Sequence, residues 1–181
     1  MKIDKIDIEG LFLMDSFYSE DDRGNFTKCF NRKNDNSHLK NFNLAETFYS
    51  KNKKNVIRGM HFQTPPYDHE KLVHVMQGSI LDVIVDLRTT SPTYGSVYNY
   101  ELSSKNKKVL FIGKGFAHGF KSLEEDTIVI YQVSTIHNKL YDNGIHYDSI
   151  NFDWGNDNHL LSSRDLSFDD FEKFKKKNPF K

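Results

Sequence analysis

The sequence predicts an all-β domain, a sandwich or barrel of short strands, with helices confined to the ends of the chain. Short apolar segments follow one another through the middle of the chain, and turn signals such as Gly78-Ser79 separate them. One segment also alternates, with Leu81, Val83 and Val85 on one face. Strands at this spacing are typical of sandwiches and barrels.

The expected strands are, in chain order, "VIRGMHFQ" (56–63), "KLVHVMQG" (71–78), "ILDVIVDLR" (80–88), "SVYNYELS" (96–103), "KVLFIGKGFAHGF" (108–120, broken by glycines) and "TIVIYQVS" (127–134). In the third, Asp82, Ile84 and Asp86 share the second face. The segment "SSRDLSFDDFEKFKKK" (162–177) predicts a short C-terminal helix, with Ser162 or Ser163 as its cap, acids early and lysines late.

Composition is consistent with one domain, residues 1–181, because the chain lacks repeats, low-complexity tracts and Gly/Ser linkers. Lys+Arg and Asp+Glu are both 25, so no global field recruits nucleic acid or a membrane surface. The absence of a signal-peptide-like or transmembrane run predicts a cytoplasmic protein. The single Cys29 excludes an internal disulfide framework and a cysteine-based zinc site.

Polar side chains occur inside these strands at unusual density. They are Arg58, His61, Gln63, Lys71, His74, His118 and Tyr131, with Asp165 before the terminal helix. Arg58 is out of register with His61 and Gln63. A buried charge without a partner is costly, so such groups in a small barrel tend to face a cavity. Taken alone, each of these residues is typical of a packed or surface position. Their number on neighbouring strands predicts a functional site.

A metal site is the first alternative. In metal-binding cupins an HxH pair, a later glutamate and a distant histidine hold the ion, and here the pair would be His61 and Gln63. One imidazole is therefore missing. Glu70 and His118 remain, but with His61 they would need ideal geometry. We therefore expect no metal.

Several segments resemble the dTDP-4-dehydrorhamnose 3,5-epimerase family of cupins, in order from about Gly10 to Asp170. They are "DDRGNFTKCF", "IRGMHFQ", "KLVHVMQGSILDVIVDLRTTSPTYG", "GKGFAHGF", "NGIHYDS" and "LLSSRDLSF". The resemblance implies a cupin jelly roll with short terminal helices, a homodimer, no metal and no organic cofactor. The implied substrate is a nucleotide-linked 4-keto-6-deoxy sugar.

The resemblance also assigns catalytic roles. His61 falls on the family's base and Asp165 on the partner that orients it. Tyr131 falls on the acid that returns a proton from the opposite face, and Lys71 is placed to stabilise the enolate oxygen. These roles suit a C4 ketone, which acidifies the C–H bonds of carbons 3 and 5.

The remaining matches concern binding. Arg58 and Arg23 match diphosphate contacts, and Arg164 is expected to join them. His118 and Gln63 are expected in the substrate pocket. In the family, Arg23 and Phe26 reach the partner subunit's site.

Three positions depart from dTDP-specific members: Lys28 replaces a glutamate, and Glu46 and Phe48 replace glutamine and asparagine. Guanine offers two adjacent donors to a carboxylate such as Glu46, and thymine offers one. This favours a GDP-linked heptose over a dTDP-linked hexose. The alternative is that Glu46 and Lys28 are solvated surface charges, either separate or paired with each other.

A family tyrosine is also missing after Tyr131, where this chain has Ile136 and His137. Inversion of carbons 3 and 5, or of carbon 3 alone, therefore stays open. The sequence predicts an epimerase that supplies a surface-polysaccharide precursor. The alternatives are a sugar-nucleotide 3,4-ketoisomerase, a metal-dependent cupin enzyme, or an inactive sugar-nucleotide-binding cupin; the last has no need of the base and acid pair His61 and Tyr131.

Overall fold

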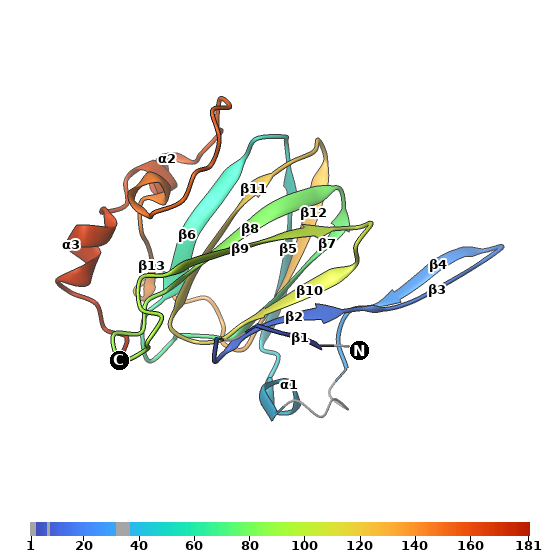
Figure 1. Ribbon diagram of the computed structural model, residues 1–181, viewed down its shortest axis with the longest axis horizontal. Coiled ribbons are helices and arrows are strands. Elements are labelled where there is room, and N and C mark those ends of the chain that lie inside the picture. Colours follow the sequence, from blue (N-terminus) through green and yellow to red (C-terminus); the bar gives the residue numbers. More distant parts are fainter. Residues whose placement is uncertain (1–2, 7, 32–36) are drawn as a thin grey trace.

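Two antiparallel sheets face each other in the computed structural model, which describes residues 3–6, 8–31 and 37–181 (Figure 1). The six-stranded sheet has the order β1 (Ile3–Lys5), β2 (Leu11–Asp15), β10 (Lys108–Ile112), β7 (Lys71–Gln77), β12 (Thr127–Val133), β5 (Glu46–Asn52). The five-stranded sheet has the order β13 (Asp142–Gly144), β6 (Ile57–Gln63), β11 (Phe116–Ser122), β8 (Ser79–Asp86), β9 (Val97–Ser103). A separate hairpin pairs β3 (Phe17–Asp21) with β4 (Gly24–Lys28). The all-β prediction is confirmed.

Every strand expected from the sequence forms, and the glycines of 108–120 separate β10 from β11. The C-terminal prediction was incomplete, because two short helices form there. Ser162 caps α2 (Ser163–Leu166), and Asp170 caps α3 (Phe171–Lys175). A helix at Ser37–Asn41 (α1) and a 3-10 turn at Tyr147–Ser149 (η1) were not expected.

The five-stranded sheet is buried on both faces. Ile80 and Ile84 of β8 belong to the core between the sheets. Val83 and Val85 pack instead into a cluster with Trp154, Phe171, Phe174 and Phe180, which the C-terminal segment lays over the outer face (Figure 1). The alternation of β8 thus separates two apolar environments. Each large apolar side chain buried in this way contributes roughly 1.5–3 kcal/mol.

An irregularity in β6 decides which side chains face inward. His118 pairs with His61, and Phe120 pairs with Arg58, so two steps on β11 match three on β6. The extra residue resets the alternation, as in a β-bulge, and brings Arg58 to the face of His61. Gly59 is required there: its φ is +147°, and an added Cβ would lie 2.5 Å from the Cα of Gly119.

Within the described residues, no helix is both long and apolar enough to cross a membrane.

Candidate active site

A cavity of about 350 Å³ opens between the inner faces of the two sheets, within the usual size range of small-molecule sites. Strands β5, β7 and β12 supply one wall, and β6 and β11 supply the other. The lining includes most of the predicted site residues: Glu46, Arg58, His61, Gln63, Lys71, His118 and Tyr131.

His61 on β6 forms a pair with Asp165 on α2. The Nε2 of His61 donates to Asp165 Oδ1 at 2.9 Å, and Gly59 N donates to Oδ2 at 3.3 Å. The cap places this carboxylate, because the Asp165 N–H donates to Ser162 Oγ at 3.1 Å. Burial alone would raise the pKa of Asp165, but the hydrogen bond and charge of His61, together with the hydrogen bonds of Gly59 and Ser162, place the pKa below its ordinary value. With Nε2 engaged, Nδ1 is the nitrogen that can accept a proton.

Tyr131 and Lys71 lie on the facing wall, on the adjacent strands β12 and β7. Burial raises the pKa of Tyr131 above its usual range. Burial lowers the pKa of Lys71 to about 8, against the charges of Asp142 and Asp82, which raise it. At neutral pH the cavity therefore offers a protonated phenol and an ammonium group opposite the imidazole. The ring of Phe48 stacks on Tyr131, with centroids 4.8 Å apart.

His118 forms a second, fully buried pair with Asp82, whose Oδ2 lies 2.9 Å from Nε2. Burial lowers the pKa of His118 and raises that of Asp82, in spite of their mutual attraction. Asp82 was not among the predicted site residues. The sequence did contain a signal for Asp82, because a carboxylate within the apolar run of β8 is expected to need a buried partner.

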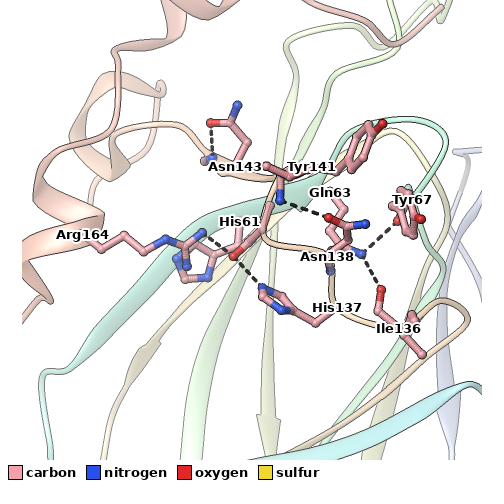
Figure 2. A network of polar contacts seen from close by, with 12 residues as sticks. His61, Gln63, Tyr67, Ile136, His137, Asn138, Tyr141, Asn143 and Arg164 are labelled. Carbon is pink, nitrogen blue, oxygen red and sulfur yellow. Dashed lines mark hydrogen bonds and ion pairs between the residues drawn. The ribbon is translucent and has the colours of Figure 1, made fainter.

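Gln63 is buried, and its amide holds the segment that follows β12 (Figure 2). Its nitrogen donates to the carbonyls of Tyr67 (3.0 Å) and Ile136 (3.3 Å), and its oxygen accepts from Asn138 N at 2.6 Å. The same nitrogen donates to His69 Nδ1 at 3.1 Å. His69 also lines the cavity, and burial lowers its pKa to about 2, so it is neutral. The amide of Gln63 is thus engaged with the protein, and sequence reasoning missed His69.

Asp142 lines the cavity and forms contacts with two further side chains, Arg164 and His137, which Figure 2 labels. Its Oδ2 accepts from Arg164 at 2.8 Å and from His137 Nε2 at 3.1 Å. Glu46, the first residue of β5, accepts from the backbone N–H of His137 at 2.9 Å. Arg164 does not line the cavity itself but pairs with Asp142, which does and which was not predicted. Asp142 lies in a segment without apolar periodicity, where no sequence signal distinguished it.

Three predicted residues lie away from the cavity, on the hairpin that projects from the sheets (Figure 1). Arg23 is 89% exposed and pairs with Asp21 at 2.6 Å. Phe26 is exposed, and the Lys28 ammonium lies 5.8 Å from the ring centre of Phe17 rather than beside Glu46. A role at the partner's site stays a prediction.

The described ranges contain no cluster of three histidine, cysteine or acidic residues able to hold a metal ion. The expected absence of a metal requirement stays a prediction.

The chain is similar to known sugar-nucleotide epimerases. Residues 5–173 match the family model described as dTDP-4-dehydrorhamnose 3,5-epimerase. The Shigella flexneri dTDP-4-dehydrorhamnose 3,5-epimerase is 35% identical over 170 residues, which cover 92% of this chain and 94% of that one. A Streptomyces niveus dTDP-4-dehydrorhamnose 3-epimerase is 28% identical over 91% of this chain and 81% of its own.

Solved structures agree with this relationship. The Bacillus anthracis dTDP-4-dehydrorhamnose 3,5-epimerase, crystallised with TDP and PPi, superposes with a TM-score of 0.87 at 34% identity, covering 94% of this chain and 99% of that one. The Legionella pneumophila dTDP-6-deoxy-D-glucose-3,5-epimerase gives 0.92 at 29% identity, with coverages of 99% and 97%. The jelly-roll expectation is thereby confirmed.

Proposed function

Because the chain belongs to the dTDP-4-dehydrorhamnose 3,5-epimerase family of isomerases, we propose that it inverts carbon 3, carbon 5 or both in a nucleotide-linked 4-keto-6-deoxy sugar. The arrangement of a base and an acid on opposite walls of one cavity carries the proposal. His61, oriented by Asp165, stands on one sheet, and Tyr131 stands on the other. Inversion needs such groups on opposite faces of one carbon. The product would serve as a surface-polysaccharide precursor.

The chemistry follows from the geometry. The Nδ1 of neutral His61 takes the proton from the carbon next to the ketone, and the C–H electron pair forms the enolate. The carboxylate of Asp165 stabilises the resulting imidazolium. Lys71 places its charge near the enolate oxygen. Tyr131 then gives its proton to the opposite face of the carbon, and the ketone re-forms.

Deuterium incorporation tests this proposal. The enzyme is incubated in D₂O with a 4-keto-6-deoxy nucleotide sugar, and deuterium is located at carbons 3 and 5 by NMR. Exchange with inversion supports the proposal, and the two positions report whether one or both carbons react. A ketone that moves to carbon 3 would identify a ketoisomerase. Nucleotide-sugar binding with no exchange at either carbon would identify an inactive binding protein.

The nucleotide has two candidates. The names of the relatives above refer to dTDP sugars, and this supports dTDP as the first candidate. Glu46 favours GDP as the second, because it lines the cavity and one of its oxygens takes the His137 N–H while the other carries no hydrogen bond within the described chain. A carboxylate accepts from both guanine donors, and a charge-assisted pair is worth roughly 1.5–3 kcal/mol, or about tenfold to hundredfold in affinity.

Titration calorimetry with GDP and dTDP separates these candidates. If Glu46 reads guanine, Glu46→Gln weakens GDP binding and leaves dTDP unchanged or tighter. Glu101→Gln, on the exposed side of β9, is the matched control. Equal wild-type affinities, or an equal loss of both nucleotides in Glu46→Gln, would leave dTDP as the assignment.

The hairpin is proposed to complete a partner's site in a homodimer, with Arg23 on the diphosphate. Its projection from the sheets and the exposure of Phe26 support this (Figure 1). Complementation tests it: in a mixed dimer of Arg23→Ala and His61→Asn chains, one site regains both native residues. Activity should therefore return on mixing after subunit exchange. Two inactive variants that stay inactive as a verified mixed dimer would show that Arg23 acts within its own chain or not at all.

A further inference from the structure

Tyr131 faces an electrostatic difficulty once it has given up its proton. Its oxygen is then a phenolate in a buried wall, and burial is the largest influence that raises the pKa of this group. A buried anion without donors is costly. The proposed reaction therefore needs a hydrogen-bond donor at this oxygen. None of the roles assigned to His61, Asp165 and Lys71 supplies one.

Ser50 on β5 stands at the required place. Its Oγ lies 3.2 Å from the Tyr131 hydroxyl. Two residues further along the same strand, Asn52 is 2% exposed and directs its amide nitrogen at Ser50 Oγ (3.1 Å) and at the carbonyl of Thr127 (3.1 Å). Neither Ser50 nor Asn52 figured among the predicted site residues.

Arg58 fixes the direction of this chain of hydrogen bonds. Its Nε donates to Asn52 Oδ1 at 2.7 Å. A guanidinium only donates, so the oxygen of the amide must face Arg58 and its nitrogen must face Ser50. Ser50 Oγ accepts from that nitrogen and keeps its own hydrogen for Tyr131. The donors thus point in one sense, from the cation of Arg58 toward the phenol oxygen.

We propose that Ser50, oriented by Asn52 and Arg58, is a positioning residue that donates to the Tyr131 oxygen and stabilises the phenolate left by proton transfer to the sugar. The inference rests on the proposed function. In that step the Tyr131 O–H bond breaks, the new C–H bond forms with the enolate electrons, and the ketone re-forms. The phenolate and the His61 imidazolium then exchange protons with solvent.

The electrostatics agree with this geometry. The hydrogen bond from Ser50 and the charge of Arg58 both lower the pKa of Tyr131, while burial and the charge of Asp82 raise it. The contributions of Ser50 and Arg58 favour the phenolate, which exists only after the proton has left. The chain therefore acts on the second half of the reaction, reprotonation, and not on proton removal by His61.

This distinction gives the test. In D₂O, an enolate that Tyr131 fails to reprotonate returns to His61 and gains deuterium on its original face. Ser50→Ala should therefore raise the ratio of deuterium exchange to inversion by about tenfold to hundredfold, the value of a hydrogen bond to a charged group, with KM unchanged. A purely structural defect lowers both rates together and leaves the ratio unchanged. Tyr131→Phe sets the upper limit of the ratio.

Three further variants complete the design. Ser50→Thr keeps the hydroxyl and should keep the wild-type ratio. Asn52→Asp still accepts from Arg58 but cannot donate to Ser50, so it should behave like Ser50→Ala. Ser104→Ala, just beyond the far edge strand β9, is the matched control and should change nothing. An unchanged ratio in Ser50→Ala would overturn the inference while the epimerase stands; a wild type with neither exchange nor inversion would overturn the proposed function itself.

Discussion

Replacement of Asp165 by asparagine tests the proposed base most directly. The change keeps the size of the side chain but removes its negative charge. That carboxylate accepts hydrogen bonds from His61 Nε2 at 2.9 Å and from Gly59 N at 3.3 Å. A hydrogen bond to a charged group contributes about 1.5–3 kcal/mol. In the proposed step His61 gains a positive charge as it takes the proton, so the loss falls on the reaction and not on binding. We expect Asp165→Asn to lower kcat by about tenfold to hundredfold with nucleotide affinity preserved.

The assay is initial-rate deuterium exchange at carbon 3, with nucleotide affinity measured in parallel by calorimetry. Asp169→Asn is the matched control, because this partly exposed carboxylate pairs with Lys177 at 2.7 Å and lies outside the cavity. Wild-type exchange in Asp165→Asn would refute the reasoning, since the imidazole would then need no carboxylate. A parallel loss of nucleotide affinity would also refute it, because the effect would not be confined to proton removal.

His61→Asn should lower turnover by roughly 10²–10⁴ and leave nucleotide affinity nearly unchanged; exchange at carbon 3 at the wild-type rate would exclude His61 as the base. Enzyme dialysed against a strong chelator should keep full activity, because in the proposed mechanism Lys71 supplies the charge at the enolate; a loss restored by a divalent metal would contradict this. Since the pKa of Lys71 is about 8, its charge is lost as pH rises, so kcat/KM should fall through that value. In Lys71→Arg, kcat/KM should fall at a higher pH than in the wild type, because a guanidinium stays protonated to higher pH than an ammonium. If kcat/KM of the variant falls at the same pH as that of the wild type, another group causes the fall.

Sequence patterns located much of the site because its main residues lie in strands with strong apolar signals. His61, Lys71, His118 and Tyr131 could be recognised as polar groups in such strands, and all four line the cavity. The register of Arg58 could not be predicted. Strict alternation along β6 would place Arg58 and His61 on opposite faces of the strand. The irregularity that places them on the same face can be seen only in the pairing of β6 with β11.

The residues that were missed share a physical reason. Ser50 lies on β5, whose polar sequence carries little strand signal, and its contact with Tyr131 spans 81 positions. Asp142 likewise meets Arg164 only through folding. The hairpin β3–β4 was not predicted because every residue in it is exposed, whereas strand prediction depends on one buried face.

The irregular strand β6 also sets a length. Under the proposed roles, Arg58 holds the diphosphate and His61 removes the proton. Their Cα atoms are three steps apart along one strand, a span of at most about 10 Å. Because β6 is paired with β11 on both sides of Gly59, the backbone separation of Arg58 and His61 is fixed. The strand therefore sets the distance between the phosphate-binding group and the base, and with it the separation of diphosphate and reacting carbon that the site can accept.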